Sequence, residues 1–143
     1  MKKSLKIKSK DRCARFLREH GITPTAQRVD IGFAVLSGCE HLSAEDVFDS
    51  VNTGTGRPRV SKATVYNTLG LFVEKGLIRE VIADPNKTFY DPNTAPHHHF
   101  YDADAGKLVD IDGADVKIVG LPPLPKGKEM AGVDVVVRLR DSA

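Results

Sequence analysis

The chain has 143 residues, of which 41% are hydrophobic and 28% charged, a composition typical of one globular domain or two small lobes. No apolar run approaches the roughly 18–20 residues of a membrane span, and the charged N-terminus lacks the apolar core of a secretory signal. We therefore expect a cytoplasmic protein without a membrane partner. Two cysteines outside any CxxC motif provide neither a disulfide framework nor a thiolate zinc site.

Charge is distributed unevenly along the chain. Residues 1–76 carry thirteen Lys and Arg against eight Asp and Glu, whereas residues 77–143 carry eight against eleven. A basic first half predicts a polyanionic partner, and a basic tail that is merely solvated is the alternative.

Four helices are predicted in the first half from apolar residues at helical spacing. The expected ranges are 11–20, 26–37, 44–51 and 62–75. Thr25, Ser43 and Ser61 stand where a side chain can cap the start of a helix, and S-A-E-D (43–46) has the pattern of a capping box. The apolar spacing of the second helix predicts an inner face of Val29, Phe33 and Leu36.

A β-hairpin is predicted after the helices. LIREVI (77–82) and TFY (88–90) are typical of strands, and DPNK (84–87) places Pro at the second position of a turn. Short helices followed by a hairpin are the order of a winged helix-turn-helix, whose last helix enters the major groove of DNA. A helical bundle with a hairpin and no nucleic-acid partner is the alternative.

The fourth predicted helix has a polar face that can reach bases and phosphates. The expected members of this face are Ser61, Lys62, Thr64, Tyr66, Asn67 and Thr68. We expect Tyr66 and Asn67 to face bases, and Lys62, Arg28, Arg57 and the lysine-rich tail to face phosphates.

Beyond residue 92 the pattern changes to strands. HHHFYDA (97–103) and KLVDID (107–112) predict an antiparallel pair, and VDVVVRLR (133–140) predicts a third strand after a loop rich in Pro and Gly. A lobe of about fifty residues is marginal alone, so we expect it to pair with a second copy. The prediction is an α+β protein with a winged helix over residues 1–91 and a small antiparallel-sheet lobe for metal binding and dimerisation over residues 92–143.

Three consecutive histidines indicate a metal site. In a strand, His97 and His99 point to one face and His98 to the other. Asp110 in the next predicted strand falls across the hairpin from them, and Asp91 lies six residues before His97. Imidazoles with carboxylates and no thiolate suit Fe(II), Mn(II) or Zn(II). A surface histidine tract without metal is the alternative.

Five segments together form a specific signature: GITPTAQR (21–28), HLSAEDV (41–47), SKATVYNTL (61–69), FYD to HHH (89–99) and GKLVD (106–110). Over nearly the whole chain they resemble the ferric uptake regulator (Fur) superfamily. The resemblance implies a homodimeric, metal-dependent transcription regulator, expected to be a repressor, that binds an A/T-rich palindromic operator in double-stranded DNA. The CxxC pairs that hold structural zinc in this superfamily are absent, so we expect no structural zinc.

Within the superfamily, the ligand pattern is most similar to the peroxide-responsive branch. Its site falls here on His41, Asp91, His97, His99 and Asp110, which implies one divalent ion per subunit and peroxide sensing when that ion is Fe(II). The triple histidine and the VDVVVRLR ending are instead similar to the iron response regulator branch, which implies iron status or bound haem as the signal.

Two other classes of function compete with a regulator. A metal-dependent enzyme could use His and Asp ligands with an open position, but no general base or substrate pocket is readable beside them, so we expect no enzyme. A metal-buffering or haem-binding protein without DNA activity is disfavoured by the basic first half and by the helix that carries Tyr66.

Overall fold

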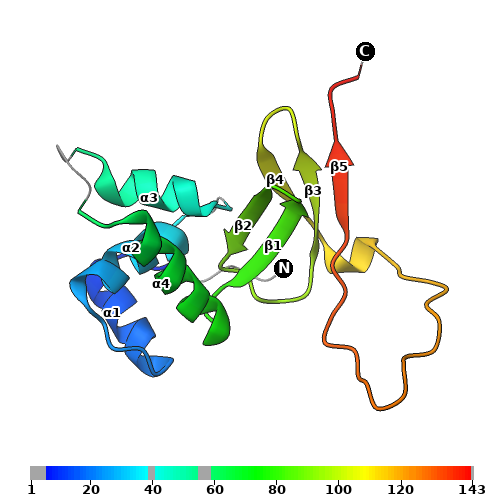
Figure 1. Cartoon of the computed structure of the whole chain (residues 1–143), viewed down its shortest axis with the longest axis horizontal. Coiled ribbons are helices and arrows are strands. Elements are labelled where there is room, and N and C mark those ends of the chain that lie inside the picture. The colour runs from blue at the N-terminus through cyan, green and yellow to red at the C-terminus, as the bar shows by residue number, and fades with distance from the viewer. Residues whose placement is uncertain (1–5, 39–40, 55–58, 143) are drawn as a thin grey trace. The chain divides into compact units, whose positions relative to one another are not determined.

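The computed structural model describes residues 6–38, 41–54 and 59–142, and the chain divides into two compact units, Met1–Thr94 and Ala95–Ala143 (Figure 1). The predicted α+β class is confirmed: the described residues form four α-helices in the first unit and small sheets in both. Among the residues described, no helix is both long enough and apolar enough to cross a lipid bilayer.

The four predicted helices all form in the first unit, as α1 (Lys10–Glu19), α2 (Ala26–Leu36), α3 (Ala44–Asn52) and α4 (Lys62–Glu74). Each begins after a hydroxyl side chain that accepts a hydrogen bond from the backbone N–H three residues later, which satisfies one of the helix's unpaired donors. These capping residues are Ser9, Thr25, Ser43 and Ser61. The capping box predicted at Ser43 is present, because the Asp46 carboxylate accepts in return from the Ser43 N–H.

The face that α2 buries differs in part from the predicted one. Ile31, Gly32 and Val35 are buried together with the predicted Leu36, whereas Val29 and Phe33 are only partly buried. Val29 and Phe33 still pack against the core, so the predicted face was incomplete: α2 is apolar on more than one side, and spacing did not identify the most buried residues.

Close contact between α1 and α2 selects this face. A Cβ atom added at Gly32 would lie 2.7 Å from the sulfur of Cys13 on α1 and 3.6 Å from the Phe72 ring on α4. Only glycine fits this approach without displacement of its neighbours.

Asn52, at the end of α3, holds the start of the segment that leads into α4. Its amide nitrogen donates to the carbonyls of Phe48 (2.9 Å) and Val60 (3.0 Å), and its side-chain oxygen accepts from the backbone N–H groups of Arg59 (2.7 Å) and Val60 (3.0 Å). One side chain thereby satisfies three polar groups of a short connection and one of α3, and positions α4 against α3.

The hairpin consists of β1 (Arg79–Asp84) and β2 (Lys87–Asp91), which pair antiparallel. Its turn is the predicted one, and the carboxylate of Asp84 accepts from the N–H of Asn86 at 2.8 Å. The first strand begins two residues later than predicted, because Leu77 and Ile78 are buried in the helical core.

The second unit contains one three-stranded sheet in the order β4–β3–β5. Its elements are β3 (His98–Asp102), β4 (Lys107–Ile111), the short 3-10 helix η1 (Gly113–Asp115) and β5 (Val136–Leu139). β3 and β4 are antiparallel as predicted, but β5 runs parallel to β3, so the sheet is mixed rather than wholly antiparallel. The long connection over residues 116–135 permits this, since parallel neighbours need a crossover of about a dozen residues or more.

Candidate metal centre and nucleic-acid interface

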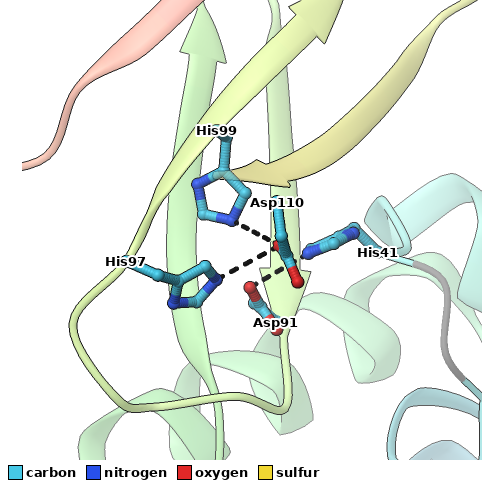
Figure 2. Close-up of side chains that lie close together, drawn as sticks. All are labelled: His41, Asp91, His97, His99 and Asp110. Carbon is cyan, nitrogen blue, oxygen red and sulfur yellow. Dashed lines mark hydrogen bonds and ion pairs between the residues drawn. The ribbon is translucent and has the colours of Figure 1, made fainter. Parts of the chain in front are cut away.

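In the second unit, two imidazoles converge on one carboxylate oxygen. The Nε2 atoms of His97 and His99 lie 3.3 Å and 3.2 Å from the same Oδ1 of Asp110 (Figure 2). The strand register produces this arrangement, because His99 pairs with Asp110 across β3 and β4 and His97 lies two residues earlier on the same face. The predicted placement of Asp110 opposite the histidines is confirmed.

The contact of Nδ1 with a backbone carbonyl shows which nitrogen of the His97 ring carries the hydrogen. Nδ1 lies 2.7 Å from the carbonyl oxygen of Ala95, which can only accept, so Nδ1 carries the hydrogen. In a neutral imidazole, Nε2 then presents a lone pair to the Asp110 oxygen. Two acceptors face each other at this point, and a cation or an added proton between them removes the repulsion.

In the first unit, a third histidine faces a second carboxylate. His41 Nε2 lies 3.0 Å from Asp91 Oδ2 (Figure 2). An isolated bridge between Leu42 and Tyr90, with a 2.8 Å backbone hydrogen bond, brings the segment before α3 beside the end of β2. The other oxygen of Asp91 accepts from the N–H of Asn93 at 2.9 Å, which orients the carboxylate.

These donor groups fit a divalent cation. Nitrogen and oxygen ligands about 2.0–2.1 Å from one ion, at right or tetrahedral angles, lie roughly 2.9–3.4 Å apart. The three N···O distances of 3.0, 3.2 and 3.3 Å fall in that range. In addition, the His97 N–H bond to a carbonyl and the Asn93 N–H bond to Asp91 are the supporting contacts that ligating groups usually make.

His98 faces away from this group, as the strand alternation predicted. Its Nδ1 accepts a hydrogen bond from the backbone N–H of Val135 at 3.0 Å, and the residue is 9% exposed. His98 therefore has a structural partner in the connection that leads into β5.

The predicted DNA-contact residues of α4 have different surroundings. Tyr66 is 48% exposed, and its hydroxyl donates to the Glu45 carboxylate at 2.7 Å. Asn67 is exposed, as is Lys62, whose ammonium lies 5.5 Å from the centre of the Phe48 ring. Thr68 is only 6% exposed, so its expected place on the polar face was wrong. It lies one turn from Val65 and Phe72 on the inner face.

The other residues predicted to contact DNA either bond within the protein or lie outside the described residues. Ser61 and Thr64 use their polar groups for the N-cap, with Ser61 Oγ accepting from the Thr64 N–H at 3.1 Å. The guanidinium of Arg28 donates to the carbonyl of Thr23 at 3.0 Å. Arg57 and residues 1–5 of the basic tail lie outside the described residues.

Sequence reasoning missed Glu45. Its carboxylate at the start of α3 suggested only a favourable charge for the helix N-terminus. Nothing in a local pattern relates it to Tyr66, which lies 21 residues further along the chain. The hydrogen bond from Tyr66 and a second one from the residue's own backbone N–H lower the pKa of Glu45, and the bond between the two side chains raises the pKa of Tyr66.

Comparisons with known proteins agree on one family. The model of the ferric uptake regulator family matches residues 19–121. The peroxide-responsive repressor PerR of Staphylococcus aureus strain Mu50 is 32% identical over 95 residues, which are 66% of this chain and 63% of that protein. PerR of Staphylococcus aureus strain USA300 is 31% identical over 95 residues, again 66% of this chain and 63% of that protein. The chain thus spans about 63% of the length of these curated relatives in the match.

Solved structures share the fold. A ferric uptake regulator from Pseudomonas aeruginosa with manganese has a TM-score of 0.66 at 24% identity, covering 92% of this chain and 98% of that one. The ferric uptake regulator of Vibrio cholerae has a TM-score of 0.67 at 18% identity, with coverages of 90% and 98%. At these identities the likeness establishes the α+β architecture alone.

Proposed function

The chain belongs to the ferric uptake regulator family, and from this premise we propose that it is a metal-dependent regulator of transcription rather than an enzyme. It binds double-stranded DNA as a homodimer and acts as a repressor while metal is bound. The observation that carries this proposal is the convergence of His97 and His99 on one oxygen of Asp110.

One divalent ion per subunit is the proposed cofactor. Its ligands come from both units of the chain: His41, Asp91, His97, His99 and Asp110. Imidazole and carboxylate donors without a thiolate suit Fe(II), Mn(II) or Zn(II). The Asn93 and Ala95 backbone contacts support this assignment, because they hold a carboxylate and an imidazole in orientations suited to coordination.

The division of these ligands between units supplies the mechanism. Asp91 is the last residue of β2 in the unit that contains α4, and His97 directly precedes β3 in the other unit, with only a short connection between them. Side chains of both units that share one ion hold the units at one angle, and so favour the dimer whose two α4 helices match successive major grooves. A tenfold preference for that form requires only ~1.4 kcal/mol.

The exposed face of α4 is proposed to read the DNA. Tyr66 and Asn67 contact bases, while Lys62, Arg28 and Arg57 contact phosphates. Ser61 and Thr64 hold the start of α4 close to the DNA backbone. Two identical subunits present two identical helices, so the proposed operator is a palindrome, A/T-rich by analogy with the family.

Peroxide is the proposed signal. The relative that is 32% identical is a peroxide-responsive repressor, and two carboxylates with imidazoles suit Fe(II), which when bound supplies the chemistry by which peroxide oxidises a nearby imidazole. A regulator that senses iron or haem through the histidine run is the second candidate. The bond from the Val135 N–H to a buried His98 counts against His98 as an axial haem ligand.

The test combines DNA binding with mass spectrometry. Fluorescence anisotropy should show tight binding to a selected duplex with Mn(II) or Fe(II), and loss of binding with a chelator. Dilute peroxide should release the Fe(II) form and add one oxygen to a peptide that holds His41 or His97–His99, and should leave the Mn(II) form unchanged. Equal DNA affinity with and without metal would overturn the proposal, and haem-dependent release without oxidation would favour the second candidate.

A further inference from the structure

The pair formed by Glu45 and Tyr66 connects α3 to the exposed face of α4. The Tyr66 hydroxyl donates to the Glu45 carboxylate at 2.7 Å, although both residues belong to the exposed surface of the first unit. A short bond to an ionised acceptor is stronger than a bond between neutral groups. The ring of Tyr66, nearly half exposed, is therefore held at its tip.

An open cleft beside the Tyr66 ring would let the ring move if the hydrogen bond to Glu45 were absent. The cleft has a volume of about 230 Å³ and lies among the start of α3, Tyr66 and the β1–β2 hairpin. Its polar lining includes Glu80 and Lys87 of the hairpin. Without the bond to Glu45, the Tyr66 ring has room to change rotamer toward the hairpin, and it would lose its fixed place on the face of α4.

The bond also determines what the hydroxyl can offer a base. A tyrosine hydroxyl has one hydrogen, and here that hydrogen is directed to Glu45. The oxygen can still accept from an amino group such as adenine N6 or cytosine N4, and the ring can contact a thymine methyl group. While it donates to Glu45, it cannot donate to guanine O6 or N7, and the Glu45 charge repels those acceptors.

We infer that Glu45 is a positioning and specificity-determining residue, which holds the Tyr66 hydroxyl as an acceptor and so sets which bases α4 prefers. This inference rests on the proposed DNA-binding function. It assigns to Glu45 a role exerted through Tyr66 rather than through a contact of its own with DNA.

The test is a double-mutant cycle on base discrimination. A preferred duplex is first selected from a randomised library with the Mn(II)-loaded wild-type protein. Anisotropy then compares it with duplexes that carry single base-pair changes, for wild type, Glu45→Ala, Tyr66→Phe and the double variant. We expect each single variant to reduce discrimination at one or two positions by roughly tenfold, and the double variant to reduce it no further.

Two further variants separate positioning from charge and folding. Glu45→Gln keeps an oxygen that can accept from Tyr66 and should restore most of the discrimination lost in Glu45→Ala. Glu80 lines the same cleft, but the Tyr66 hydroxyl donates to Glu45. Glu80→Gln should therefore leave base discrimination unchanged. Circular dichroism confirms that each variant is folded.

A readout without DNA tests the pair directly. Absorbance at alkaline pH, with Tyr66→Phe used to assign the signal among the three tyrosines, should show a lower pKa for Tyr66 in Glu45→Ala than in wild type. If Glu45→Ala still alters discrimination in the Tyr66→Phe background, or changes neither discrimination nor the titration, the inference is overturned while DNA binding stands. If wild type selects no duplex with any metal, the proposed function fails and takes this inference with it.

Discussion

The backbone N–H of Val135 donates a 3.0 Å hydrogen bond to Nδ1 of His98. This bond joins the middle of the histidine run to the chain segment that enters β5, the strand that pairs parallel to β3. His98 therefore supports the sheet, whereas its two neighbours turn to Asp110.

His98→Ala is expected to destabilise the protein while it leaves metal binding intact. Removal of the ring leaves the Val135 N–H without its acceptor, at a cost of roughly 1–3 kcal/mol in the free energy of unfolding. His98→Asn, whose side-chain oxygen can replace Nδ1, should recover part of the loss. Urea unfolding and Mn(II) binding of the three proteins provide the measurement, and a His98→Ala protein of unchanged stability that no longer responds to haem would favour the haem-sensing alternative.

Loss of a single ligand should remove the metal. Asp91→Ala and His97→Ala are each expected to lower Mn(II) affinity by at least about tenfold and to abolish metal-dependent DNA binding, because a site between elements loses a donor without loss of core packing. Equilibrium dialysis followed by metal analysis measures the affinity. Asp49→Ala is the matched control, since that carboxylate is exposed on α3 and belongs to no group of described side chains that could hold a metal ion. Full metal occupancy in both ligand variants would exclude this ligand set.

Contacts to bases and to phosphates should respond differently to mutation. Tyr66→Ala is expected to relax sequence preference at a cost of about 1–3 kcal/mol. Lys62→Ala should weaken binding to all duplexes and reduce the salt slope by about one unit. Lys75→Ala, at the opposite end of α4, is the control for charge. The measurement is anisotropy at several salt concentrations, and a Tyr66→Ala protein with wild-type discrimination would contradict the base-contact role.

Gly32→Ala should destabilise the first unit by roughly 1–3 kcal/mol, because the new methyl group would meet the Cys13 sulfur at 2.7 Å. Cys13→Ala in the same chain provides room and should make the glycine substitution nearly neutral. Thermal or denaturant unfolding of the two single variants and the double variant measures the coupling. Strictly additive effects would show that another neighbour limits the approach of α1 and α2.

Burial of Cys13 should make stability depend on alkaline pH. Desolvation raises the pKa of its thiol from 9.0 to about 11, so the folded state holds the proton over a range in which the unfolded chain releases it. This contribution is complete below about pH 9 and is lost between about pH 9 and pH 11, by about 2–3 kcal/mol. The free energy of unfolding should fall less steeply over this range in Cys13→Ala, and identical slopes would contradict the assignment.

Local chemistry determined much of this protein from the sequence alone. The caps at Ser43 and Ser61 and the turn after Asp84 each depend on groups within about three residues, so their positions could be predicted. The placement of His97 and His99 on one face follows from the two-residue period of a strand in the same way.

Only the tertiary structure decided the features that join distant segments. The parallel course of β5, the Val135 contact of His98 and the bond between Glu45 and Tyr66 depend on which elements pack together, and no local period encodes that choice. The inner face of α2 has the same origin, because a helix that is apolar on several sides buries the face that its neighbours can approach, here through Gly32. Local hydrogen bonds and periodicity therefore specified the elements, while long-range packing specified their partners.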